Sequence, residues 1–373
     1  MTDHEACIAL NLTQGIGPAR AALLLQTFGS ASAVFEHTAD ELSTVHGISP
    51  ALAENILANA GAPLERELDL IRRSDIQVLT RDDYLYPEPL KNIEDPPLCL
   101  YVCGVLPEEL ATTSVAIVGS RRATMYGMRM AQHLAESAAC SGWVVVSGLA
   151  SGIDTAAHKG TVGVKGKTVA VLGGGLMKIQ PQENIELARS ILEMNGAVIS
   201  EHPMLFPPTR HSFPMRNRII SALSIATIVV EAGSRSGALI TAATATEQGK
   251  HVFAVPGNAD NEMSVGCNEL IKSGNAALLT SFEDVLSVAD FLPGFSLKEE
   301  NVPLLQNDFD DDGVINENDR LILDHLRKEG DSQFDSISAA TGISAGELSR
   351  KLIALEISHR IERCPNGAYR RLR

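Results

Sequence analysis

Apolar residues are spaced in two different ways along the chain. Up to residue 80 they recur at the spacing of a helix, whereas from Ser114 onward short apolar runs alternate with segments of helical period. The six runs end in turn-forming or polar residues, and they are "SVAIVGS", "WVVVSG", "TVAVLGGG", "GAVISEHP", "IATIVVEA" and "KHVFAVPG". Buried strands separated by helices predict an α/β fold with a doubly wound, mostly parallel sheet.

The helical part before residue 80 contains two similar segments. "LTQGIGPARAALLLQTFG" (12–29) and "LSTVHGISPALAENILANAG" (42–61) each run from a helix through a Gly-Ile turn into a second helix. The first resembles a helix-hairpin-helix motif, in which Gly15 and Gly17 turn the chain so that backbone amides at a helix start face a phosphate. The pattern equally fits a small helical bundle whose glycines only make tight turns, and a role in binding a partner protein is also open.

The end of the chain resembles a winged helix. "NDRLILDHLRKEG", "FDSISAATG" and "SAGELSRKLIALEISHRIERC" predict three helices, and "PNG" begins a hairpin that returns through "AYRRLR". Residues 344–359 would be the recognition helix, for DNA or for a protein. The whole pattern predicts a helical domain at 1–80, a core at 81–290, an acidic linker at 291–315 and a winged-helix domain at 316–373.

Two of the predicted strand ends carry small and charged residues, and ligands of doubly wound sheets bind beyond the carboxyl ends of the strands. "VGSRRATMYG" (118–127) places two arginines at a helix start, where guanidinium groups and the helix dipole suit an anion. "SGLASGIDTAAHKG" (147–160) keeps the backbone open with small residues. In it we interpret Asp154 as a helix cap and His158 as a structural histidine, because no nucleophile or metal ligand is near them in the sequence.

Two further stretches have the composition of a nucleic-acid site. "RHSFPMRNRIISALS" (210–224) combines basic residues with Phe213, and a single strand needs both, because phosphates attract cations and bases stack on aromatic rings. "EAGSRSGALITAATATEQGK" (231–250) is another strand-to-helix turn, where Ser234, Ser236 and Gly237 are placed to donate amides to a phosphate.

Two nucleotide motifs are only partly present. Gly166-Lys167-Thr168 resembles the end of a P-loop, but the apolar run 169–172 follows it, so it enters a strand instead of leaving one. A dinucleotide fingerprint is not expected either, because Arg121 stands where that motif needs its second glycine.

Composition and charge limit the possible functions. No apolar run approaches the ~18 residues of a membrane span, and the six cysteines form neither a metal knuckle nor a disulfide framework, so we expect a cytoplasmic protein without metal or membrane. The net charge of −15 opposes nucleic-acid binding. However, residues 1–110 hold 6 Lys and Arg against 17 Asp and Glu, whereas residues 111–290 hold 14 of each. A local basic site in the core is therefore compatible with the sequence.

Together and in this order, "IVGSRRATMYG", "VVSGLASGIDTAAHKG", "TVAVLGGGL", "FPMRNRIISALS" and "VVEAGSRSGALITAATATEQGKHVFAVPG" resemble the DNA processing protein A family, also called DprA or Smf. The resemblance covers about half the chain, from Ser114 to Asp284. It implies a Rossmann-like core that binds single-stranded DNA, protects DNA taken up in natural transformation (competence) and loads the RecA recombinase onto it. It also implies a homodimer with no cofactor and no catalytic residue.

The resemblance also assigns residues. The family's Gly-Ser-Arg turn falls on 119–121, its Arg-Asn-Arg motif on 216–218, and its lysine before the third glycine turn on Lys167, with Lys165 as a second candidate. Many members have a Tyr-Pro pair where this chain has 179–181, so no base-stacking residue is assigned there. The DNA-binding residues predicted from the sequence are Gly119, Ser120, Arg121, Arg122, Ser147, Gly148, Lys165, Lys167, Gly173, Gly174, Arg216, Asn217, Arg218, Ser236 and Gly237.

The alternative prediction is a Rossmann-like nucleotide-processing enzyme, similar to the nucleoside-monophosphate phosphoribohydrolases. Those proteins use P-G-G-x-G-T followed by a glutamate, whereas this chain has "EAGSRSGALITAATATEQ" at the comparable strand end, without the paired glycines. If the chain is a single-strand binder, we expect residues 111–290 alone to retain that binding.

Overall fold

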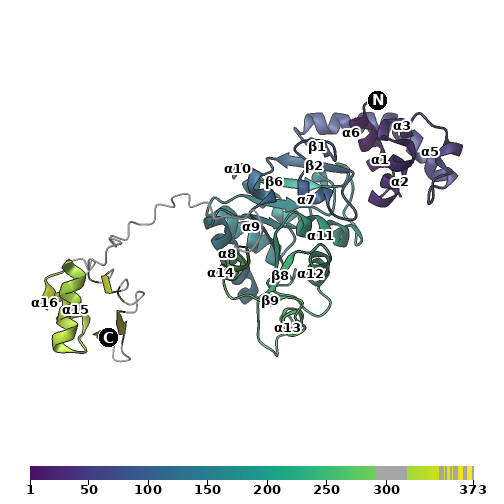
Figure 1. Cartoon of the computed structure of the whole chain (residues 1–373). Helices are drawn as coiled ribbons and strands as arrows, with labels where there is room; N and C mark the ends of the chain where they lie inside the picture. The colour runs from purple at the N-terminus through teal and green to yellow at the C-terminus, as the bar shows by residue number, and fades with distance from the viewer. Residues whose placement is uncertain are drawn as a thin grey trace. The chain divides into compact units, whose positions relative to one another are not determined.

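The computed structural model describes residues 1–289, 317–343, 348, 351, 352, 355, 360–363 and 368–371. The chain divides into two compact units, Met1–Ser296 and Leu297–Arg373 (Figure 1). The acidic linker predicted at 291–315 lies outside the described residues, and so does most of the recognition helix predicted at 344–359. Among the described residues, no helix is long and apolar enough to cross a membrane.

The first unit begins with a helical domain that contains two glycine turns. Gly15 and Gly47 have φ values of +97° and +83°, a region that glycine adopts without strain. The two turns are linked by Arg20, which donates from Nη1 to the Gly15 carbonyl at 2.6 Å and also lies against Gly47. The tandem hairpins predicted from the sequence are therefore present. The helices are α1 (Asp3–Leu12), α2 (Pro18–Phe28), α3 (Ala31–Val34), α4 (Ala39–Leu42), α5 (Pro50–Asn59) and α6 (Ala62–Arg73).

A nine-stranded sheet forms the centre of the first unit, in the order β1-β2-β6-β5-β4-β3-β7-β8-β9. In the part of the sheet ordered β6-β5-β4-β3-β7-β8-β9, every pair of neighbouring strands is parallel. β2 is antiparallel to both of its neighbours, β1 and β6. The predicted doubly wound, mostly parallel sheet is confirmed, with antiparallel strands added at one edge. The strands are β1 (Gln77–Thr80), β2 (Cys99–Gly104), β3 (Ser114–Val118), β4 (Val144–Ser147), β5 (Thr168–Val171), β6 (Ala197–Ser200), β7 (Ala226–Val229), β8 (His251–Ala254) and β9 (Ala277–Leu278).

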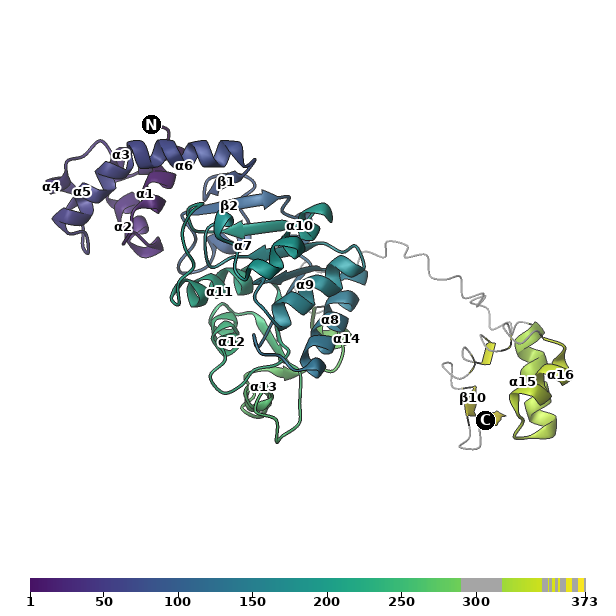
Figure 2. The ribbon, with the colours of Figure 1, turned by 180° about the vertical axis from the view of Figure 1, so that it is seen from behind.

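Helices cover both faces of the sheet (Figure 2). Successive strand residues point to opposite faces, so Val115 and Ile117 of β3 pack with α8 and α9, whereas Ala116 and Val118 pack with α11 and α12. Because β3, β4 and β7 are parallel, the turns that follow them lie together at the carboxyl ends of the strands. The helices are α7 (Glu88–Lys91), α8 (Met125–Cys140), α9 (Ile153–Gly163), α10 (Ile185–Glu193), α11 (Ser212–Ala222), α12 (Gly237–Glu247), α13 (Val265–Lys272) and α14 (Glu283–Ala289), with 3-10 turns at Glu108–Ala111, Leu176–Lys178 and Gln182–Asn184.

The helical domain and the sheet share one hydrophobic core. Leu10 of α1 and Tyr101 of β2 belong to the same cluster of buried residues. The buried Glu67 of α6 accepts a hydrogen bond from the Met204 amide at 2.7 Å, which ties the domain to the loop after β6. Residues 77–80, which the predicted boundary assigns to the helical domain, form β1 of the sheet.

The described residues of the second unit include two complete helices, further helical residues at 348, 351, 352 and 355, and an antiparallel hairpin. Ile322, Ile337 and Leu352 are among the buried residues of its own core. This order of elements is the one that the winged-helix prediction requires. The elements are α15 (Glu317–Glu329), α16 (Phe334–Thr341), β10 (Ile361–Arg363) and β11 (Tyr369–Arg371).

Candidate nucleic-acid interface

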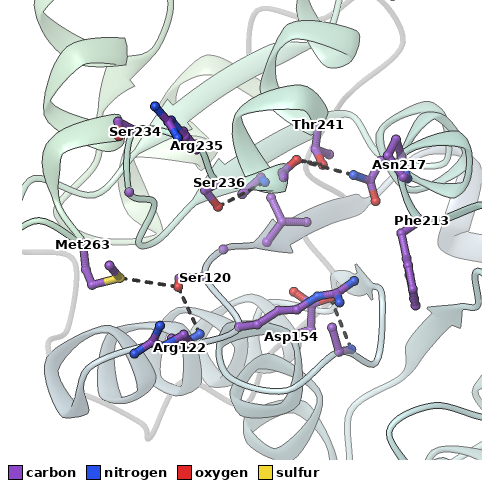
Figure 3. A pocket seen from close by; sticks show the side chains of 18 of the residues that line it. Ser120, Arg122, Asp154, Phe213, Asn217, Ser234, Arg235, Ser236, Thr241 and Met263 are labelled. Atoms are coloured by element: carbon purple, nitrogen blue, oxygen red, sulfur yellow. Dashed lines mark hydrogen bonds between the residues drawn. The ribbon is translucent and has the colours of Figure 1, made fainter. Parts of the chain in front are cut away.

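A cavity of about 680 Å³ lies at the carboxyl ends of the central parallel strands (Figure 3). Its walls come from the turns after β3, β4 and β7, from the segment after β8 and from the start of α11. The structure brings together eight of the residues predicted from the sequence, and these are Gly119, Ser120, Arg121, Arg122, Arg216, Asn217, Ser236 and Gly237. The others, Ser147, Gly148, Lys165, Lys167, Gly173, Gly174 and Arg218, are not part of its lining.

The turn between β3 and α8 presents Arg121 and Arg122 at the cavity. The Ser120 amide donates to the Glu231 carbonyl at 2.7 Å, and the Ser120 hydroxyl accepts from the Arg122 amide at 3.1 Å. Both arginines are exposed, and neither forms an ion pair with another described residue. Their guanidinium groups are therefore available to an anion.

Glu231, just after β7, anchors the same turn with its side chain. Its buried carboxylate accepts from the Thr124 amide and from the Thr124 hydroxyl, each at 2.7 Å. Thr124 in turn caps α8, because its hydroxyl accepts from the Gly127 amide at 3.2 Å. A Cβ at Gly127 would collide with the Glu231 carboxylate, so glycine is required there. The arginine turn is thus held by a buried carboxylate.

The turn between β4 and α9 is structural. Ser147 is buried, and its hydroxyl donates to the Ile117 carbonyl at 2.7 Å. The buried Asp154 accepts from the amides of Gly148 and Ala150 at 3.1 and 3.4 Å, so it braces the turn before α9. The cap of that helix is Gly152, not Asp154 as the sequence suggested.

The histidine of α9 is also structural. His158 is fully buried, and its Nδ1 lies 2.8 Å from the Thr168 hydroxyl. Burial lowers the pKa of His158 to about 3, and the charge of Arg216 acts in the same direction. The imidazole is therefore neutral near pH 7, which agrees with the structural role predicted from the sequence.

Arg216 of α11 is buried at the cavity wall. Its guanidinium occupies the space beside Gly148, where a Cβ would have no room, and donates from Nη1 to the Val171 carbonyl at 2.7 Å. Its Nε has no hydrogen-bond partner among the described residues. Burial lowers the pKa of Arg216 to about 10, so the side chain keeps its charge at neutral pH. Next to it, Asn217 is half-buried and lines the cavity.

Arg218 lies elsewhere, although the sequence predicted it to bind DNA with Arg216. It forms a buried bidentate ion pair with Glu201, at 2.6 and 3.0 Å. It also donates to the carbonyls of Asp95 and Met215, both at 3.0 Å. Because these bonds engage all three guanidinium nitrogens, Arg218 holds α11 to neighbouring loops and is not presented to a ligand.

An aromatic ring lies at the cavity opposite Ser234 and Arg235 (Figure 3). The Arg121 guanidinium carbon lies 4.3 Å from the centroid of the Phe213 ring, a cation–π contact. Phe213 packs on Gly173, where a Cβ would come within 2.9 Å of the ring. Gly174 is packed in the same way against Pro208. The two glycines therefore allow close packing of this loop, and their contact with DNA stays a prediction.

The turn between β7 and α12 forms a further wall, and the segment after β8 also lines the cavity, through Glu262, Met263 and Val265. Ser236 caps α12 by accepting from the Ala238 amide at 3.3 Å, so the start of an 11-residue helix opens on the cavity. Arg235 is exposed beside it, without an ion pair in the described part of the chain. The sequence prediction missed Arg235. Its position between two serines at a strand-to-helix turn was the available signal.

The two predicted lysines lie at the other edge of the sheet. Lys167 directly precedes β5, so it stands at the amino end of a parallel strand, whereas the cavity lies at the carboxyl ends. Its Nζ forms an ion pair with Glu109 Oε1 at 2.7 Å, which lowers the pKa of Glu109. Lys165 is two residues earlier. Neither lysine can join Arg121 in one phosphate site, and their contact with DNA stays a prediction.

Three family patterns match the chain. The pattern described as DNA recombination-mediator protein A matches residues 77–290, the SAM-like helix-hairpin-helix tandem matches 10–61, and the DprA winged helix domain matches 317–367. The chain is 33% identical over 390 residues to Protein Smf of Synechocystis, covering 98% of both proteins. It is 41% identical over 245 residues to Protein Smf of Escherichia coli, covering 66% of this chain and 65% of that protein.

Two solved structures are also similar. DNA processing protein A from Streptococcus pneumoniae aligns with a TM-score of 0.65 and 32% identity, covering 77% of this chain and 98% of that one. DNA processing protein A from Helicobacter pylori, whose structure describes a single-stranded DNA binding mode, aligns with a TM-score of 0.51 and 31% identity, covering 58% of this chain and 96% of that one.

Proposed function

The chain belongs to the DNA processing protein A (DprA/Smf) family, and from this premise we propose that it binds single-stranded DNA as a recombination mediator in natural transformation. One observation supports the proposal most directly. Arg121, Arg122 and Arg235 surround a cavity that also contains Phe213, and none of the three pairs with a carboxylate in the described structure. Free cations beside an aromatic ring suit a strand whose phosphates are charged and whose bases are unpaired.

The site assignment follows from this arrangement. We propose that Arg121, Arg122 and Arg235 contact phosphates, together with the amides at the start of α12, and that Phe213 offers a stacking surface. Gly119 and Ser120 shape the arginine turn, whereas Arg216 contributes a buried charge. A duplex offers no unstacked base to Phe213, so we expect the single strand to bind more tightly.

The same site is proposed to act without catalysis. Asp154 is committed to two backbone amides, and His158 is buried and neutral, so this pair does not form an acid and base couple. The alternative, a phosphoribohydrolase-like enzyme, predicts that a nucleoside monophosphate releases its base on incubation with the protein. Chromatography of the incubated nucleotide distinguishes the two, because the mediator function predicts an unchanged nucleotide.

The partners named by the family resemblance are part of the proposal. We propose that the protein works in the cytoplasm as a homodimer and loads RecA onto the bound strand. Sedimentation velocity tests the dimer. Assembly of RecA on DNA that is coated with single-strand binding protein tests loading, and faster assembly in the presence of the chain is expected.

The binding experiment is fluorescence anisotropy with a labelled oligonucleotide, single-stranded and duplex, at two salt concentrations. We expect tighter binding of the single strand, weakened by salt as phosphate contacts require. Equal affinity for both forms would contradict the stacking role of Phe213. Absence of binding to either form would overturn the proposed function.

A further inference from the structure

The cavity at the carboxyl ends of the strands has the dimensions of a small-molecule site. Its volume of about 680 Å³ falls within the roughly 300–1,000 Å³ typical of sites for small ligands. It combines apolar walls with a few converging polar groups, which is also typical of such sites. A polymer that only crosses the surface requires no hollow of this size.

We propose that this cavity binds a free nucleoside 5′-monophosphate, which competes there with single-stranded DNA. The competition rests on the proposed function, whereas the binding of the nucleotide does not. The ligand is a single nucleotide, with its phosphate at the arginines and its base at Phe213.

Four guanidinium groups line the cavity and can receive a phosphate. Arg121, Arg122 and Arg235 are exposed and have no carboxylate partner among the described residues. Arg216 is 3% exposed, lines the cavity and has an Nε without a hydrogen-bond partner in the described part of the chain. The start of α12 opens on the same space. A helix start alone would not define a site, but a buried, incompletely bonded guanidinium that lines the same cavity adds an independent donor for an anion.

The base end of the site is Phe213 and Asn217. Phe213 offers a ring face on which Arg121 now lies, at 4.3 Å from the ring centroid. An aromatic base can take that place or stack against the guanidinium plane. Asn217 lines the cavity, and within the described residues its side chain forms one hydrogen bond, a long one of 3.5 Å to the Gly237 carbonyl. Its amide can therefore donate to and accept from a base edge. Since one amide can satisfy several bases by flipping, we expect little preference among bases.

Isothermal titration calorimetry of the full chain with deoxythymidine monophosphate tests the proposal, with thymidine and inorganic phosphate as half-ligands at constant ionic strength. We expect the monophosphate to bind with a Kd of about 1 mM or tighter, and each half-ligand at least tenfold more weakly. Arg121→Ala should weaken the monophosphate at least tenfold. Arg129→Ala is the matched control, because Arg129 is an exposed arginine of α8 outside the cavity, and it should leave binding unchanged.

A displacement assay then tests competition, using a labelled oligonucleotide bound to the chain. Release by the monophosphate, but not by an equal concentration of phosphate or thymidine, supports the proposal. If the oligonucleotide binds and the monophosphate neither gives heat nor displaces it, the nucleotide site is refuted while the proposed DNA binding stands. If the monophosphate binds and the oligonucleotide does not, the nucleotide site stands and the proposed function fails. Equal weakening by Arg129→Ala and Arg121→Ala would overturn the location of the site.

Discussion

The arginines near the carboxyl ends of the strands differ in burial, and their burial determines what each can do. Arg121, Arg122 and Arg235 are exposed at the cavity, whereas Arg216 and Arg218 are buried and bonded within the fold. An exposed guanidinium can bind a phosphate without disturbing its neighbours. A buried guanidinium is already bonded to carboxylate or carbonyl oxygens that water does not reach.

Arg218→Ala should therefore reduce stability more than DNA affinity. The substitution leaves the Glu201 carboxylate buried without its cation, which costs about 3–5 kcal/mol. Arg121→Ala is the matched comparison and should leave the free energy of unfolding within about 0.5 kcal/mol of the wild type. Urea unfolding of both variants checks this. A fully stable Arg218→Ala variant with lost DNA binding would instead restore the contact predicted from the sequence.

Burial of His158 makes the stability of the fold depend on pH. Its folded pKa of about 3 lies below the unfolded value of about 6.5. Between these values the unfolded chain binds the proton and the folded chain does not, so stability falls as the pH decreases through this window. At pH 5 the protonation of His158 in the unfolded chain lowers the free energy of unfolding by about 2 kcal/mol. The free energy of unfolding, measured with urea at pH 7.5 and at pH 5, should change less between the two pH values for His158→Gln than for the wild type. An identical pH dependence would contradict the buried neutral state.

The sequence did not show which of its arginines are buried or which groups those arginines contact. Arg216 and Arg218 belong to one short motif, yet only Arg216 reaches the cavity, because Glu201 lies beside Arg218 in space although it is 17 residues away in sequence. Arg235 is exposed at the cavity but was not predicted, because the serines and glycine around it indicate a phosphate site made of backbone amides. Composition near a turn thus identified the cavity but did not separate its ligand-facing side chains from its supporting ones.

At the scale of elements, the start of α8 depends on Glu231. Its carboxylate holds the Thr124 amide and hydroxyl, and its carbonyl holds the Ser120 amide, on either side of Arg121 and Arg122. We infer that Glu231 is a positioning residue for these arginines.

Glu231→Ala should weaken single-strand binding by roughly tenfold, the loss of about one charge-assisted hydrogen bond. Glu231→Gln keeps an acceptor for the Thr124 amide, so it should restore most of the affinity. Anisotropy titrations of both variants measure this, with the thermal midpoint recorded to confirm folding. If both folded variants bind as the wild type does, Glu231 does not position the turn.

The strands were predictable where they are buried and followed by glycine turns. All six strands expected from Ser114 onward are present as β3 to β8, because each is a short apolar run between helices. The antiparallel pairing of β1 and β2 was not predicted, since the direction of an edge strand depends on which neighbour it meets. β9 has only two residues, both exposed, so it lacks the apolar signal. Lys167 was assigned to DNA binding from the family resemblance alone, and the structure places it at the amino end of β5.

At the scale of the whole molecule, the helical domain cannot be treated as separate from the sheet. The shared core and the bond from the Met204 amide to Glu67 join them. The fragment 111–290 expected from the sequence to suffice would also lose β1 and β2, of which β2 pairs with β6. The four-part division at 80, 290 and 315 remains a proposal, with 77–80 structurally part of the sheet.

We predict that the first compact unit, Met1–Ser296, retains the fold and the single-strand affinity of the full chain. Fragment 111–290 should lack a cooperative thermal transition, because it exposes the apolar faces of β6 and α10 that now pack against β2 and the helices. Calorimetry and anisotropy on both fragments provide the comparison. Loss of binding in the longer fragment would place part of the DNA site in the second unit.

The central claim is that three exposed arginines around one cavity bind the phosphates of a single strand. Its most direct test is the salt dependence of binding, measured by anisotropy for the wild type and for the combined variant Arg121→Ala, Arg122→Ala and Arg235→Ala. The slope of log K against log salt should become less steep by about 2, since each lost phosphate contact removes roughly 0.7. Arg129→Ala should leave the slope unchanged. Equal slopes and affinities for the wild type and the combined variant would contradict the claim and place the DNA site elsewhere on the chain.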